Sequence, residues 1–169
     1  MVSKKIAVLF LSALVSVPVP AATVSFLIVE TGLPPGADAN EHSSLWESGL
    51  FDVFFDAGHI VSNAPILRLE GKFEKELPET ARADIDEAAQ GGMDYFIIAV
   101  LDYPLAEISE TETAAVRPDQ VSLKLFTTSP CRLLFEQRCG KKQLTSMDDE
   151  FLWVKQEVRR LLPQLNDPQ

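Results

Sequence analysis

The pattern of apolar and polar residues along the chain predicts a small sheet organised around one strand. No residue from Tyr95 to Leu101 is charged, and aromatic and β-branched side chains dominate this run. Such a short apolar run is typical of a strand that is covered on both faces. Gly91 and Gly92 precede it and Pro104 follows it, and these residues stop regular structure. We therefore expect the central strand of the domain here.

Further strands are predicted before and after it. Val24–Val29 is β-branched and apolar, which indicates a second buried strand. Ile66–Glu70 is a short alternating run that we expect near an edge. Val121–Thr127 alternates apolar and polar residues, and Arg132–Arg138 returns after a turn. The central strand and these last two should therefore form an antiparallel meander.

One long helix is predicted between the first strand and the short edge strand. Ser44 and Glu47 match a capping box, a pattern that starts helices. Apolar residues then recur with helical spacing along one face, so we expect the helix to run from Ser44 to Ser62. This stripe consists of Trp46, Leu50, Val53, Phe54, Ala57, Ile60 and Val61.

Two further helices complete the predicted domain. Pro78 suits a helix start, and Gly91 is expected to be the left-handed residue that ends this second helix. Ser146 is predicted to cap a last helix over Asp148–Leu165. The sequence thus predicts a single α/β domain, with a mixed sheet of four to five strands packed with two to three helices.

The first residues have the features of a secretory signal peptide. Lys4 and Lys5 precede the apolar run Ile6–Val17, and small residues follow it. A retained membrane anchor is the alternative, but the run is shorter than the roughly 20 residues that a span needs. We expect cleavage after Ala21, a mature domain of residues 22–169, and export to the periplasm, with no stable membrane span.

Charge restricts the partners that this domain can have. The formal net charge of the chain is −10. An acidic domain repels phosphate groups, which argues against nucleic acid and anionic membrane surfaces as partners.

The two cysteines, Cys131 and Cys139, would lie in an oxidising compartment after export, where a disulfide is the usual expectation. Eight extended residues span about 26 Å, whereas a disulfide needs Cα atoms within about 7 Å. If the chain between them is a strand, they do not pair with each other. A disulfide to another chain stays open.

Acidic residues and histidines near the first helix are the candidates for metal chemistry. Asp52, Asp56 and His59 follow helical spacing on the side away from the apolar stripe, and His42 or Glu30 could join them across the preceding loop. A metal site needs three or four converging ligands, so a solvated helix face is the favoured interpretation. Glu30 also ends a strand where open α/β sheets place ligands, although an ordinary strand end is favoured there. The sequence indicates no catalytic residue and no cofactor.

Two aromatic residues of the first helix are candidates for an interaction surface. Phe51 and Phe55 fall roughly opposite the apolar stripe on a helical projection. Either this helix is buried on two sides, or both rings are exposed. Clustered exposed aromatic rings mark interaction surfaces. The free edge beside Ile66–Glu70 is a second candidate surface, for strand addition by a partner.

Three segments and the order of the elements resemble a group of exported bacterial α/β domains. The segments are Val24–Glu30, Gly58–Ser62 and Gly92–Phe96, and a meander and a terminal helix follow them. In this order the chain is similar to the amino-terminal domain of TolB and to LpoB, CsgG and FlgO. That resemblance implies partner binding in the cell envelope, without catalysis and without catalytic residues. The hairpin turn Thr127–Pro130 lacks the Asp…Thr-Gly pattern of the group, and no cysteine follows the apolar run for lipid attachment.

We therefore expect an exported, non-catalytic domain that binds another envelope protein in an adaptor or assembly role. The identity of the partner is open, as is assembly into a homo-oligomer. The alternative is a small metal-dependent hydrolase that uses the loop after the first strand, with Glu30, His42, Asp52, Asp56 and His59 as its candidate residues.

Overall fold

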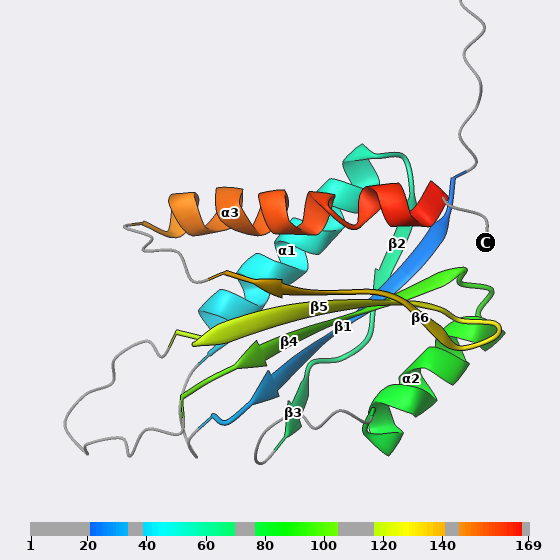
Figure 1. Cartoon of the computed structure of the whole chain (residues 1–169), viewed down its shortest axis with the longest axis horizontal. Coiled ribbons are helices and arrows are strands. Elements are labelled where there is room, and N and C mark those ends of the chain that lie inside the picture. The colour runs from blue at the N-terminus through cyan, green and yellow to red at the C-terminus, as the bar shows by residue number, and fades with distance from the viewer. Residues whose placement is uncertain (1–20, 34–38, 70–76, 105–116, 141–145, 167–169) are drawn as a thin grey trace, which may run out of the picture.

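The structure is a computed structural model, and it describes residues 21–33, 39–69, 77–104, 117–140 and 146–166 (Figure 1). Apart from Ala21, the predicted signal peptide lies outside these residues. The elements are β1 (Thr23–Thr31), α1 (Asn40–Asp56), β2 (Ile60–Asn63), β3 (Leu67–Leu69), α2 (Glu79–Gln90), β4 (Tyr95–Asp102), β5 (Gln120–Thr127), β6 (Arg132–Cys139), α3 (Met147–Arg159) and the 3₁₀ helix η1 (Leu162–Asn166).

All six strands belong to one mixed sheet in the order β2-β1-β4-β5-β6, with β3 pairing along the same edge of β1 as β2. Strands β1 to β4 are parallel, whereas β5 and β6 continue as antiparallel strands. The predicted central strand is therefore confirmed as β4, and so is the predicted meander. Helices α1 and α3 cover one face of the sheet and α2 covers part of the other (Figure 1).

Two apolar cores lie on the two faces, because side chains alternate along each strand. The larger core joins residues such as Phe26 of β1 and Ile97 of β4 to α1 and α3. The smaller core joins Leu27 and Phe96 to Ile85 of α2. In the described residues every helix is too short or too polar to span a bilayer.

The predicted bounds of the first helix are wrong at both ends. Helix α1 begins at Asn40, and its cap position makes no side-chain hydrogen bond, so the predicted capping box does not form. The helix ends at Asp56, and Gly58 then adopts a φ of 85°. Ile60–Asn63 forms β2 instead of the last helical turn, because its backbone pairs with the open edge of β1. This extra strand raises the count from the expected four or five to six.

The other two helices follow the predictions more closely. Ser146 caps α3, since its hydroxyl accepts a hydrogen bond from the Asp149 N–H at 3.1 Å. The α-helix ends at Arg159, short of the predicted end, and the chain continues as η1. Gly91 is not left-handed, because its φ is −73°, and the positive φ belongs to Gly92.

The hairpin places the two cysteines at opposite ends of β6. Cys131 is exposed just before the strand, and Cys139 is buried at its last residue. Both are free cysteines. The predicted strand between them is confirmed, and with it the geometric reason that they do not bond to each other.

Candidate functional site

A buried polar cluster lies at the carboxyl end of β1. The side chain of Glu30 is fully buried and accepts hydrogen bonds from two directions. The Ser43 hydroxyl, in the first turn of α1, donates to one carboxylate oxygen. The Arg68 Nε, on β3, donates to the other at 2.7 Å, while half of the arginine side chain stays in solvent. Glu30 is therefore a paired carboxylate, and the positive end of α1 favours its charge.

The same cluster holds a buried histidine–carboxylate pair. The Nδ1 atom of His42 lies 2.7 Å from Oε1 of Glu150, and both side chains are almost inaccessible to solvent. An imidazole nitrogen that faces a carboxylate carries the proton, so Nδ1 is the donor. Arg117 lies 4.0 Å from the other carboxylate oxygen. This pair ties the first turn of α1 to the first turn of α3.

The hydroxyl of Tyr103, just after β4, completes the cluster. Burial, reinforced by the negative charges of Glu30 and Glu150, raises the pKa of Tyr103 well above its usual value. The phenol therefore stays protonated at physiological pH and is no nucleophile. With two carboxylates facing two arginines and a histidine, the cluster balances its own charges and fixes how β1, β3, α1 and α3 meet.

Of this cluster, the sequence singled out Glu30 and His42. It gave His42 or Glu30 as candidates that could join a metal site across the loop after β1, and the structure brings both residues to that end of the sheet. Glu150 and Tyr103 were missed. Their available signals were an acidic residue in the first turn of the last helix and a tyrosine directly after the central strand.

The other candidate metal ligands do not join them. Asp52 accepts a hydrogen bond from Lys155 at 3.1 Å, and Asp56 is exposed at the end of α1. His59 lies beyond the helix, buried, and its Nδ1 accepts from the Ala22 N–H at 3.1 Å. Because α1 ends at Asp56, His59 does not share a helical face with Asp52 and Asp56 as the spacing predicted. Across the described ranges no three His, Cys, Asp or Glu side chains converge as metal ligands.

At the opposite end of the sheet the structure has an open pocket of about 670 Å³. Asp94 and Thr128 are among its lining residues, and both are engaged within the fold. The Asp94 carboxylate accepts from the N–H and the hydroxyl of Thr23, at 2.9 and 2.8 Å. The Thr128 hydroxyl donates to the carbonyl of Met93. These hydrogen bonds tie residues that line the pocket to the start of β1 and to the residues before β4.

The two candidate aromatic residues of α1 have different environments. Phe51 is half-buried and packs edge-on against Phe26, with ring centroids 5.1 Å apart and planes at 80°. Phe55 is 73% exposed. The hypothesis of two exposed rings is thus wrong for Phe51, because its ring packs against Phe26 of the sheet.

A second exposed apolar residue follows Phe55 in the chain, across the turn into β2. Ile60, the first residue of β2, is 59% exposed. The two residues flank the tight turn 57–59, in which the Gly58 N–H donates to the Phe55 carbonyl at 2.9 Å. Strand β2 pairs only with β1, so its outer edge is open among the described residues. We call Phe55, Ile60 and this edge the turn surface.

These features define an α/β domain with one mixed sheet, a charge-balanced buried cluster and an exposed apolar turn. The chain belongs to the family described as "Uncharacterised protein", whose model matches residues 34–148. No curated protein matches the chain. Among solved structures, the PelC dodecamer from Paraburkholderia phytofirmans is similar, at 11% identity and a TM-score of 0.48 over 88% of this chain and 90% of that one. A point variant of the same PelC dodecamer is similar at 10% identity and a TM-score of 0.48, over 87% of this chain and 90% of that one.

Proposed function

We propose that the protein is an exported, non-catalytic domain that binds another protein of the cell envelope through the turn surface. The observation that carries this proposal is the exposure of Phe55, a large ring on an ordered helix that leaves most of its surface in water. Fully burying a phenylalanine side chain contributes about 1.5–3 kcal/mol, so a partner that covers this ring gains a substantial anchor.

The position of Phe55 supports this proposal further. Phe55 lies at the end of α1 shortly before β2, whose outer edge is open among the described residues, and a partner can add a strand to such an edge. Ile60 lies on that strand, 59% exposed. The turn surface therefore offers a strand edge for backbone pairing and, on the element that precedes it, an exposed apolar anchor.

The polar residues support a binding role over a catalytic one. Glu30 and His42 are engaged in buried pairs, and Asp52 is paired with Lys155. Since His59 accepts from the backbone at the other end of α1, no observation favours the metal-dependent hydrolase. Export rests on the pattern of the first residues, and an adaptor or assembly role rests on the resemblance to the TolB, LpoB, CsgG and FlgO group.

Two measurements test this proposal. The first is fractionation of cells that express the full chain, followed by amino-terminal sequencing, and we expect a periplasmic product that begins at Ala22. The second is affinity purification from cross-linked envelopes, comparing the parent with Phe55→Ser. Leu152→Ser on α3 is the matched control, because Leu152 is an exposed apolar residue on another surface, at 61% exposure. Equal recovery of every co-purified protein from parent and Phe55→Ser would refute the turn surface.

A further inference from the structure

The second open edge of the sheet is longer than the first. Strand β6 is the last in the sheet order, so only β5 pairs with it among the described residues. It has eight residues, whereas β2 has four and β3 has three. Long free edges are templates for pairing with another chain.

A bulge limits the regular part of this edge. Leu125 of β5 pairs with Phe135 and its neighbour Phe126 pairs with Leu133, so Leu134 is an extra residue on β6. A bulge bends the strand and interrupts its ladder. The stretch that can accept another strand is therefore Phe135–Cys139.

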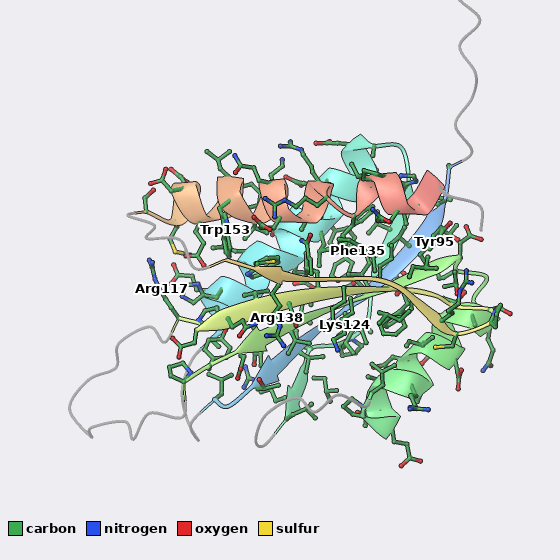
Figure 2. The ribbon with its side chains drawn as sticks, viewed as in Figure 1. Tyr95, Arg117, Lys124, Phe135, Arg138 and Trp153 are labelled. Carbon is green, nitrogen blue, oxygen red and sulfur yellow. The ribbon has the colours of Figure 1, made fainter. Side chains whose placement is uncertain are left out.

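Charged side chains of both signs lie on the face of the sheet away from α1 and α3. Glu136 pairs in register with Lys124, and their charged atoms are 3.4 Å apart. Arg138 pairs in register with Ser122 and has no carboxylate within ion-pair distance among the described residues. Figure 2 shows Lys124 and Arg138 on this face, with Phe135 on the side of α3. The edge thus ends in an exposed Glu–Arg pattern.

Geometry restricts how two such edges can meet. In an antiparallel pair the opposed residues share a face of the sheet. A two-fold axis between identical strands must then lie midway between one residue and the same residue of the second copy. It cannot lie level with a point between two successive residues of the strand. An axis at Glu136 or Arg138 opposes like charges, and an axis at Phe135 brings the Leu134 bulge into the ladder. An axis at Gln137 avoids both.

We infer that β6 pairs antiparallel with β6 of a second copy of this chain about an axis at Gln137. Glu136 then faces Arg138 of the partner subunit, and the symmetry repeats this pair. On each side of the axis, a row of charged side chains crosses the joined sheet from Lys124 through Glu136 to the partner's Arg138. On the other face, Phe135 lies opposite Cys139 of the partner subunit, which places two apolar side chains together. This interface is separate from the turn surface and does not depend on the proposed function.

Charge reversal of the purified protein tests the register. Sedimentation equilibrium across a concentration series should show a dimer for the parent. Glu136→Arg and Arg138→Glu each set like charges opposite each other at two symmetric places. The dissociation constant of the dimer should rise by about tenfold or more in each, and the double reversal should restore it. A parent that is monomeric throughout, or a double reversal as weak as the single ones, would overturn the inference.

Disulfide trapping tests the axis independently. With Cys131→Ser as background, Gln137→Cys places its thiol on the two-fold axis, where opposed Cβ atoms about 4.5–5.5 Å apart come near disulfide geometry. We expect rapid covalent dimers from this variant under mild oxidation. Gln156→Cys, at an exposed position on α3, is the matched control and should stay monomeric. Equal trapping at both positions would contradict the proposed pairing.

Discussion

Gly49 of α1 lies where α1 packs against α3, and replacing it with alanine tests that contact. A Cβ added at Gly49 would clash with Cγ1 of Val154, because the two atoms would lie far inside the normal carbon–carbon distance of about 3.5–4.0 Å. Val154 is fully buried and β-branched, so its methyl group cannot rotate away at low cost.

Two effects of opposite sign decide the result of Gly49→Ala. Alanine is better than glycine inside a helix by about 1 kcal/mol. Overpacking a buried contact costs about 1–3 kcal/mol. The clash should win, and we expect a net loss of about 1–2 kcal/mol in the free energy of unfolding.

A double-mutant cycle with Val154→Ala isolates the clash. Because this change removes the obstructing Cγ1 atom, Gly49→Ala in that background should stabilise the protein by up to about 1 kcal/mol. Urea unfolding of the four proteins measures both effects, provided the m-value is constant. If Gly49→Ala stabilises the parent as much as the Val154→Ala background, the described packing of α1 on α3 is wrong.

Three further predictions concern other parts of the fold. Phe51→Ser should lower the free energy of unfolding by about 2 kcal/mol because it removes the ring contact with the sheet, whereas Phe55→Ser should change it by less than about 0.5 kcal/mol; equal losses in urea unfolding would contradict the assignment. Burial, reinforced by a neighbouring glutamate, raises the pKa of the Cys139 thiol to about 12, so a thiol reagent at pH 8 should modify Cys131 quickly and Cys139 only on unfolding. Burial lowers the pKa of His59 in the folded protein. As the pH drops below the ordinary value of about 6.5, the unfolded chain therefore binds a proton at this histidine more readily than the folded chain does, and the free energy of unfolding should fall. His59→Gln should flatten that part of the stability–pH curve, and an unchanged slope would refute the assignment.

The elements whose signal is local could be predicted from the sequence. The run Tyr95–Leu101 is apolar at every position because both faces of β4 are covered, and such a run identifies a central strand without further information. The cap at Ser146 depends only on residues within one turn, so it too was predictable. Strand β2 was not, because Ile60 and Val61 continue the helical spacing of α1. Their strand conformation comes from pairing with β1, a contact that the local pattern does not encode.

The candidate sites show the same limit. Glu30 and His42 could be placed at one end of the sheet because each is close in sequence to the loop after β1. The partner of His42 is Glu150, which is 108 residues away in the chain, and no periodicity links the two. Helical spacing also gave Phe51 and Phe55 similar positions. The contact of Phe51 with Phe26 of β1, which no local pattern encodes, separates them.

The central claim is that a partner protein covers Phe55, and site-specific photo-cross-linking in intact cells tests it most directly. A photoreactive phenylalanine analogue at position 55 should give a discrete cross-linked product with one envelope protein. The same analogue at position 152, on exposed α3, should not give that product. Identical products from positions 55 and 152, or no product from position 55 at native expression levels, would contradict the account.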